Sequence, residues 1–492
     1  MGAGRHTETP ITPSDAGARR HLALAMAVVM TGVLITAVDT TIVVLALPEI
    51  QHSLRISLAS VVWVVIGYLL VITLLATQVG RLGDMYGRVR MYQAGFLIFI
   101  VGSAACALSW NETSIIGFRI LQGLGGALVS SNSGAVIADL FPPSQRGRAY
   151  GFNSVGWSLG AVLGIVLGGA IVTYVSWRWI FWINVPIGLA AVALAVKVLH
   201  DVGERRRHKL DIVGMVLLGA GLFGVLWAAT RLTSENLDPT ISGLFIGGLV
   251  LVVLFALYEK RRTEPMLDLS IFSIPTVTPT LLASLFQGLA NYAVLFLVIM
   301  YLQGPRGLSP LNASLLLVPG YMLGGVIGPF AGRLADRTAP VVPATIGLAV
   351  QVVAMVIYAH LKVDTSLVLV VVASVVNGAG SSSFFPANNS AVMKAVPATR
   401  FGIASGMLRT FANVGMVFSF AVAILVASHS ISRGLAFAIF VGSAKLSGQL
   451  AIAFTDGLHT AFYTSAGLLV LSAVFSATRI RHGTGRSARA TA

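Results

Sequence analysis

Apolar stretches of about twenty residues recur along the whole chain, separated by short polar segments. A helix that crosses a bilayer needs about 20 predominantly apolar residues, so each stretch is long enough to span the membrane. The fourteen stretches cover residues 22–48, 58–79, 90–110, 114–138, 148–174, 178–198, 211–230, 240–258, 276–303, 311–332, 340–360, 366–393, 401–428 and 456–478. Backbone polar groups in lipid must be satisfied within a helix or a closed barrel, and stretches of this length are too long for barrel strands. The pattern predicts an all-α integral membrane protein with fourteen transmembrane helices.

The composition leaves little of the chain for a soluble domain. Hydrophobic residues make up 56% of the 492 residues and charged residues 10%, whereas soluble proteins average about 25% charged. The longest polar segments are the stretch up to Arg20, the segment 200–209 and the tail after Arg479, and none is long enough to bury a core. No nucleotide-binding loop, catalytic triad or cluster of metal ligands is evident, so we expect no enzyme and no cofactor beyond a coupling ion. The single cysteine, Cys106, excludes an internal disulfide.

Basic residues are concentrated in alternate connections between the apolar stretches. The connection after residue 79 holds Arg81, Arg88 and Arg90, whereas the next connection holds none. Because basic loops stay on the cytoplasmic side, this alternation places both termini in the cytoplasm of a multi-pass inner-membrane protein. It also accounts for the net charge of +15 without a nucleic-acid partner. The segment 434–454 is apolar but interrupted by polar residues, and we predict a re-entrant or interfacial segment there, because a further span would put the basic tail outside.

The sequence repeats itself at an offset of about 252 residues. Gly80-Arg81-Leu82-Gly83-Asp84 returns as Gly332-Arg333-Leu334-Ala335-Asp336 in the same orientation. Parallel repeats of six helices are one architecture of secondary transporters, with the substrate near the midplane between the halves. We therefore predict a cytoplasmic tail (1–21), a six-helix bundle (22–200), an inserted two-helix hairpin with basic flanks (201–262), a second six-helix bundle (263–479) and a second cytoplasmic tail (480–492), functional as a monomer.

Three motifs resemble those of a known family. The loop Gly80-Arg81-Leu82-Gly83-Asp84-Met85-Tyr86-Gly87-Arg88-Val89-Arg90 resembles the signature loop of the major facilitator superfamily. The segments 38–48 (VDTTIVVLALP) and 177–188 (WRWIFWINVPIG) resemble the fourteen-helix drug:proton antiporter branch. The resemblance implies two parallel six-helix bundles and the export of amphiphilic drugs or metabolites in exchange for protons, with consequent drug resistance.

Asp39 is the only carboxyl group placed deep in a predicted span. It lies roughly 13 Å from Pro48 along the helix, near the bilayer midplane. A charge there costs at least about 2.5–3.5 kcal/mol, and burial favours the neutral acid whereas a nearby cation favours the carboxylate. Asp39 is therefore predicted to carry the proton, although a permanent pair with an arginine remains open. By the resemblance Arg119 senses that proton, and we expect it to be the partner of Asp39.

The resemblance also implies a gate and a packing face. Gly80, Asp84, Gly87 and Arg88 are expected to form the gate, in which Asp84 and Arg88 latch the cytoplasmic ends of the two halves, although simple helix capping by Asp84 is an alternative. The packing face comprises Gly156, Gly160, Gly164, Gly168 and Gly169, whose spacing allows close helix approach. The chain departs from the family at Ile165, where proline is usual, and at Val44, where asparagine is common.

Polar and aromatic residues within the spans are candidates for substrate contact, and helix–helix hydrogen bonding is an equal alternative for the amides. They are Trp63, Tyr68, Gln122, Asn132, Gln287, Asn291, Asn377, Phe385, Asn388 and Arg409. The later spans hold no deep acid, which favours neutral, monocationic or amphiphilic substrates over dications. Two other functions fit the same pattern, namely export of a lipid or lipid-like metabolite, and a non-transporting membrane sensor.

Overall fold

The computed structural model of the chain is a bundle of long helices. It describes residues 13–141, 143–201, 210–232, 238–262, 265–267, 269–396, 401–429 and 448–487, and this part of the chain holds no strand. The helices of the first half are α1 (Pro13–Leu54), α2 (Leu58–Tyr86), α3 (Arg88–Ala107), α4 (Glu112–Leu140), α5 (Pro143–Tyr174), α6 (Trp179–Trp182) and α7 (Asn184–Val198). The hairpin is α8 (Ile212–Arg231) and α9 (Pro239–Glu259). The second half comprises the short helix η1 (Leu269–Ser273), then α10 (Val277–Gln303), α11 (Pro310–Leu315), α12 (Val318–Arg337), α13 (Val341–Tyr358), α14 (Leu367–Ala395), α15 (Phe401–His429) and α17 (Gln449–Ser487).

The described helices confirm the predicted all-α membrane fold. Thirteen are long and apolar enough to cross a bilayer, and α2 makes a fourteenth if its two segments, which meet at 56°, form one span. Two predicted spans are each built from two helices. The span 178–198 divides into α6 and α7 just before Pro186, and 311–332 divides into α11 and α12 just before Pro319. Proline lacks the backbone N–H that would continue a helical hydrogen-bond ladder, which explains both breaks.

The end of the first helix differs from the sequence prediction. The first helix does not end at Pro48 but continues to Leu54, because proline removes one backbone hydrogen bond without ending a helix that is packed by its neighbours. Helix α5 runs without a break through Ile165, so the residue that replaces proline there leaves the helix uninterrupted. Of the ambiguous segment 434–454, residues 434–447 lie outside the described part of the chain, and α17 begins at Gln449.

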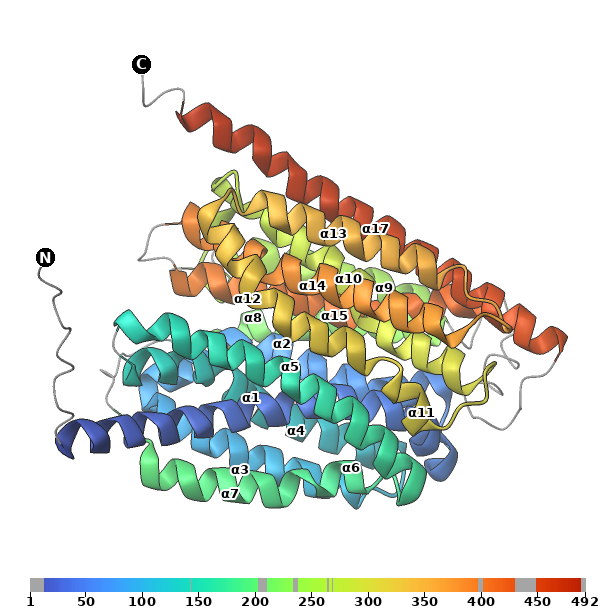
Figure 1. Cartoon of the computed structure of the whole chain (residues 1–492), viewed down its shortest axis with the longest axis horizontal. Helices are drawn as coiled ribbons and strands as arrows, with labels where there is room; N and C mark the ends of the chain where they lie inside the picture. Colours follow the sequence, from blue (N-terminus) through green and yellow to red (C-terminus); the bar gives the residue numbers. More distant parts are fainter. Residues whose placement is uncertain are drawn as a thin grey trace, which may run out of the picture.

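The same helix pairings occur in both halves. Helix α1 packs on α5, α3 on α4 and α2 on α4 in the first half, and α10 packs on α15, α13 on α14 and α12 on α14 in the second. Each pairing in the first half thus has a counterpart in the second, as expected for parallel repeats. Figure 1 shows the first half (blue to green) lying against the second (yellow to red), with the ends of α1 and α17 that lead to the termini toward the left.

The hairpin packs along α2 and α15. Helices α8 and α9 approach closely at Gly221 and Gly248, where a methyl group on Gly248 would lie 2.7 Å from the Gly221 carbonyl oxygen. Helix α8 contacts α2 from the first half and α15 from the second. Helix α8 of the hairpin therefore touches both halves at the line where α2 meets α15.

The two halves also meet at the end opposite the termini. Helix α5 contacts α11 and α12, and α11 lies toward the right of Figure 1. The Leu311 N–H lies 3.3 Å from Thr173 Oγ1 and donates to it, and a methyl group on Gly169 would lie 2.8 Å from Leu311 Cα. This approach closes the bundle between α5 and α11 at that end.

Candidate functional site

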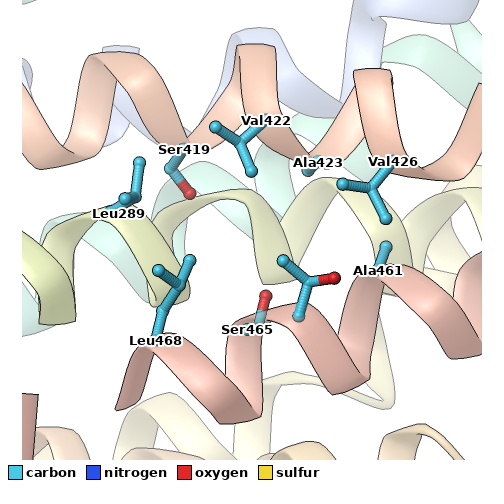
Figure 2. Close-up of a pocket in the computed structure, with 9 residues that line it drawn as sticks. Leu289, Ser419, Val422, Ala423, Val426, Ala461, Ser465 and Leu468 are labelled. Carbon is cyan, nitrogen blue, oxygen red and sulfur yellow. The ribbon is translucent and has the colours of Figure 1, made fainter. Parts of the chain in front are cut away.

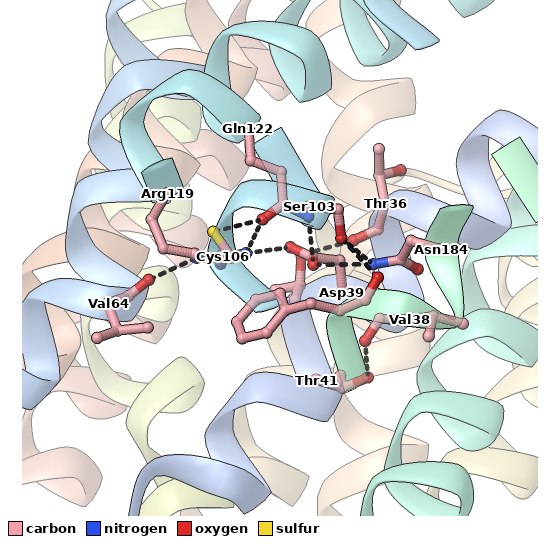
Figure 3. Close-up of polar contacts among 12 residues, drawn as sticks. Thr36, Val38, Asp39, Thr41, Val64, Ser103, Cys106, Arg119, Gln122 and Asn184 are labelled. Carbon is pink, nitrogen blue, oxygen red and sulfur yellow. Dashed lines mark hydrogen bonds and ion pairs between the residues drawn. The ribbon is translucent and has the colours of Figure 1, made fainter. Parts of the chain in front are cut away.

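Asp39 and Arg119 form a fully buried ion pair. Asp39 lies on α1 and Arg119 on α4, and Arg119 Nη1 is 2.7 Å from Asp39 Oδ2. Both side chains have 0% of their surface exposed. The structure thus brings together the acid and the arginine that we expected from the sequence to be partners, as Figure 3 shows.

Gln122 completes the pair from the next turn of α4. Its Nε2 donates to Asp39 Oδ1 at 2.8 Å, and its Oε1 accepts from Arg119 Nη1 at 2.7 Å. Residues three apart on a helix lie on one face, which is why Arg119 and Gln122 reach the same carboxylate. Gln122, a substrate candidate from the sequence, therefore lies within the ion-pair site.

Asn184, Ser103 and Cys106 extend the polar site toward α3 and α7 (Figure 3). Asn184 Nδ2 donates to Ser103 Oγ at 3.1 Å and lies 3.5 Å from Asp39 Oδ1. Cys106 Sγ is 3.7 Å from Gln122 Oε1. Neither Asn184 nor Ser103 was predicted to be a site residue from the sequence. Asn184 lies within the motif at 177–188, and this position was the one feature of the sequence that could have identified it as a site residue.

Arg119 has neutral partners that do not depend on Asp39. Its Nε donates to the Val64 carbonyl oxygen at 2.7 Å, and its guanidinium carbon lies 4.2 Å from the centre of the Tyr68 ring. A buried cation over an aromatic face gains about 2 kcal/mol or more. Within the described part of the chain, Arg119 Nη2 and the Tyr68 hydroxyl have no hydrogen-bond partner. If the carboxylate is neutralised, Arg119 therefore keeps several stabilising contacts. Its Nη2 group is then still available as a hydrogen-bond donor.

The loop after α2 holds a second charged cluster. Arg88 Nη2 lies 2.8 Å from Asp84 Oδ1, and Arg88 Nη1 lies 2.7 Å from Asp139 Oδ1 at the end of α4. Both pairs join elements of the first half, so in this conformation Arg88 ties α2 to α4. Asp139 was not predicted to be a site residue, because it stands at the end of a predicted span, where solvated acids are common.

Gly80, Gly83 and Gly87 differ in why the structure needs glycine at their positions. Gly87 has a φ of 107°, which side-chain-bearing residues rarely adopt. A methyl group on Gly83 would collide with the Asn132 side chain, whereas one on Gly80 would meet nothing within 4 Å. The turn thus requires glycine at position 87, and close packing requires it at position 83.

Four of the five glycines on α5 make close helix contacts. A methyl group on Gly160 would lie 2.8 Å from the Leu34 carbonyl oxygen, and one on Gly164 would lie 2.7 Å from that of Val38. Gly168 faces α1 as well, and Gly169 faces α11. Gly156 has room, since its nearest neighbour would be 3.8 Å away.

Several of the substrate candidates are engaged in helix–helix hydrogen bonds. Trp63 Nε1 donates to Thr230 Oγ1 of the hairpin at 3.1 Å. Gln287 Nε2 donates to Gln351 Oε1 at 3.1 Å, and Asn388 Nδ2 donates to Ser284 Oγ at 2.7 Å. The side chain of Asn132 donates to the Leu128 carbonyl oxygen of its own helix. The indole and the amide nitrogens thus donate to the protein itself in this conformation, whereas Asn132 Oδ1 and Gln287 Oε1 have no partner in the described residues.

The remaining candidates lie on helices of the second half. The Oδ1 atoms of Asn291 and Asn377 are buried without a partner in the described residues. Phe385 is half-buried beside Phe384, with ring centres 5.6 Å apart. Arg409 is exposed on α15, and its Nη1 lies 3.5 Å from the Ser130 carbonyl oxygen of α4, so it reaches across to the first half.

A cavity between α10, α15 and α17 is too small for a solute. Its volume is about 10 Å³, close to the minimum for one water molecule. Figure 2 shows Ser419 and Ser465 among apolar side chains around it. Among the described residues, no group of three or more histidine, cysteine or acidic side chains is placed to hold a metal ion.

Comparisons with known proteins agree on one family. The sequence profile of the Major Facilitator Superfamily matches residues 29–420. The chain is 32% identical over 392 residues to the tetracenomycin C resistance and export protein of Streptomyces glaucescens, covering 79% of this chain and 72% of that protein. It is 32% identical over 332 residues to the uncharacterized MFS-type transporter Rv1250 of Mycobacterium tuberculosis (strain ATCC 25618 / H37Rv), covering 67% of this chain and 57% of that protein. A crystal structure of a bacterial homologue of the human lysosomal transporter Spinster, inward-facing and unoccupied, matches with a TM-score of 0.65 at 17% identity, covering 93% of this chain and 96% of that one. At that identity the last match shows the fold alone.

Proposed function

Because the chain belongs to the Major Facilitator Superfamily, whose members are transporters and not enzymes, we propose that it exports amphiphilic compounds in exchange for protons. The observation that carries this proposal is the buried pair of Asp39 and Arg119, 2.7 Å apart and closed off from solvent. An ionisable residue within a membrane span is costly and marks a functional site. The similarity to a resistance and export protein supports export as the direction of transport.

The other contacts of Arg119 and Asp39 support a mechanism for proton exchange. When Asp39 takes up a proton, its attraction to Arg119 is lost, but the cation keeps Gln122, the Val64 carbonyl oxygen and the Tyr68 ring. These contacts lower the cost of separating the pair. When Asp39 releases the proton, the ion pair forms again with Gln122 as a bridge. The Arg119 guanidinium thus attracts Asp39 only when Asp39 is ionised, and Arg119 keeps its other contacts in both states.

The alternation of basic connections supports an orientation in the cytoplasmic membrane with both termini inside. We propose that the protein acts there as a monomer. In that orientation the contact of α5 with α11 closes the outer side. Protons would reach Asp39 from outside when this contact opens, and would leave toward the cytoplasm when the buried pair is opened to that side.

The membrane potential supplies enough energy for useful accumulation. One proton moving inward gains about 2.3 kcal/mol per 100 mV. At one proton per molecule, that energy sustains roughly a fortyfold gradient of an uncharged substrate. Selection against dications is consistent with the absence of an acid among the described residues deep in the spans of the second half.

Proton flux in reconstituted vesicles tests the proposal. Purified protein in liposomes with pyranine in the lumen is given ethidium and other amphiphilic dyes, and substrate-dependent changes of lumenal pH are followed. Asp39→Asn should abolish these changes. Glu49→Gln, a change of an exposed acid on the same helix, should leave them intact. Full coupling in Asp39→Asn would rule out the assigned role of Asp39.

A further inference from the structure

Asp211 and Glu259 form a pair of buried carboxyl groups at one end of the hairpin. Asp211 precedes α8 and Glu259 ends α9, and their residues are 0% and 2% exposed. One oxygen of each has a backbone donor: Gly214 N–H donates to Asp211 Oδ1 at 2.9 Å, and Leu267 N–H donates to Glu259 Oε2 at 2.9 Å. This pair plays no part in the proposed coupling at Asp39.

The two remaining oxygens converge without a donor. Within the described residues, Asp211 Oδ2 and Glu259 Oε1 have no hydrogen-bond donor. Both border the same point, since a methyl group on Gly214 would lie 2.5 Å from the first and 2.8 Å from the second. Two ionised carboxylates offer only acceptors, so a single proton held between these oxygens would supply the donor that both lack.

The pair is attached to the inner segment of α2. Asp211 N–H donates to Gln78 Oε1 at 3.2 Å, and Gln78, which is 1% exposed, has no partner for its Nε2 in the described residues. Arg81 Nη2 donates to the Pro265 carbonyl oxygen at 2.6 Å, just beyond Glu259. Helix α2 then continues to Asp84 and the loop at Arg88. A change at the carboxyl pair therefore acts on the part of α2 that leads into this loop.

Among the residues that the structure describes, the charged groups near the pair come from the hairpin and from α2. From the hairpin, Arg262 Nη2 lies 4.0 Å from Asp211 Oδ1, and the Arg262 guanidinium carbon lies 5.4 Å from the centre of the Tyr258 ring. From α2, Arg81 is the nearby charged group, and it is directed to a carbonyl oxygen. The Gly214 N–H and the Arg262 guanidinium both favour the ionised form of Asp211. Glu259 has no such cation in contact within the described part of the chain, which favours it as the carboxyl group that would hold a shared proton.

We propose that Asp211 and Glu259 form a second proton-binding site, whose single shared proton holds the end of the hairpin against α2. In the orientation proposed above, this site faces the cytoplasm. As pH rises on that side, loss of the shared proton leaves two adjacent buried negative charges, which repel each other. The hairpin end then separates from Gln78. Closure of this contact is therefore favoured at low pH and lost at high pH.

Infrared titration of the purified protein tests the shared proton without any transported substrate. The carbonyl stretch of protonated carboxyl groups should be present in the wild type near neutral pH and should fall at alkaline pH. Glu259→Gln should remove that titrating component, because the amide donates permanently to Asp211. Asp39→Asn and Glu49→Gln should each leave it in place. An unchanged titration in Glu259→Gln would overturn the proposal.

Hydrogen exchange tests the link to α2. In the wild type, amides of α8 near Gly214 and of the segment 266–267 should lose protection at alkaline pH beyond the chemical increase seen in peptides of α13. Glu259→Gln should abolish this extra loss. Asp211→Asn, in which asparagine still caps α8, serves as the second variant. Equal loss of protection in wild type and both variants would contradict the proposal, whatever the outcome for transport at Asp39.

Discussion

Arg119 Nη1 lies 2.7 Å from Asp39 Oδ2 although the two residues are 80 positions apart in the chain. Removing one member of a buried ion pair leaves an uncompensated charge and costs about 3–5 kcal/mol. Asp39→Asn should therefore destabilise the protein strongly, and adding Arg119→Gln should restore part of that loss. Thermal unfolding in detergent measures both variants. Wild-type stability in Asp39→Asn would show that the pair contributes nothing to folding, and equal stability of the single and double variants would show that the unpaired Arg119 charge is not what destabilises the single variant.

The glycines of α5 predict unequal effects of the same substitution. Gly164→Ala places a methyl group against Thr41 and 2.7 Å from the Val38 carbonyl oxygen, so α1 and α5 must separate. Overpacking of this kind costs about 1–3 kcal/mol. Gly156→Ala is the matched control, because its methyl group meets its nearest neighbour at 3.8 Å. The unfolding temperature should fall for Gly164→Ala and stay near the wild-type value for Gly156→Ala, and the reverse order would refute the packing argument.

Arg88 should be more sensitive to substitution than Arg90. Arg88 contacts both Asp84 and Asp139, whereas Arg90 lies 3.8 Å from Asp201 with 64% of its side chain exposed. Arg88→Ala should cost about 1 kcal/mol and reduce transport, and Arg90→Ala should change stability by less than about 0.5 kcal/mol. Dye efflux by vesicles and unfolding in detergent measure the two effects. Comparable losses in both variants would argue against a specific role for the Arg88 contacts.

The contact between α5 and α11 predicts a reversible lock. Leu311 N lies 3.3 Å from Thr173 Oγ1, which brings the two residues within reach of a disulfide after substitution by cysteine. Oxidation of Thr173→Cys/Leu311→Cys should stop transport, because the halves can no longer separate at that end, and reduction should restore it. The two single variants are the controls, and the natural Cys106 is buried. Transport that continues in the fully oxidised double variant would show that this contact stays closed throughout the cycle.

The fold was largely predictable because the bilayer acts on the chain locally. A span must be long, apolar and internally hydrogen-bonded, and these demands are visible within any twenty-residue window. The limits of the helices were less predictable. Pro48 lies within α1, whereas α6 and α11 end a few residues before Pro186 and Pro319. The neighbours that support a helix through a proline come from other parts of the chain.

The candidate site was predictable in part. Asp39 and Arg119 could be selected because a charge within an apolar stretch has an evident cost. Asn184 and Ser103 are uncharged and have no such signal, and Asp139 stands at a span end where acids are common. Trp63, selected as a substrate candidate, donates to Thr230 in the hairpin, which no spacing within one helix could indicate.

The sequence by itself determined how often the chain crosses the membrane, which loops carry the positive charge, and which charged groups stand deep in the lipid. Only the tertiary structure decided that Gln122 bridges Asp39 and Arg119, that Arg88 joins α2 to α4, and that Asp211 and Glu259 border the same point beside Gly214. The reason is physical. Span length and polarity are properties of consecutive residues, whereas each of these contacts depends on the rotation and separation of helices that packing sets across the whole bundle.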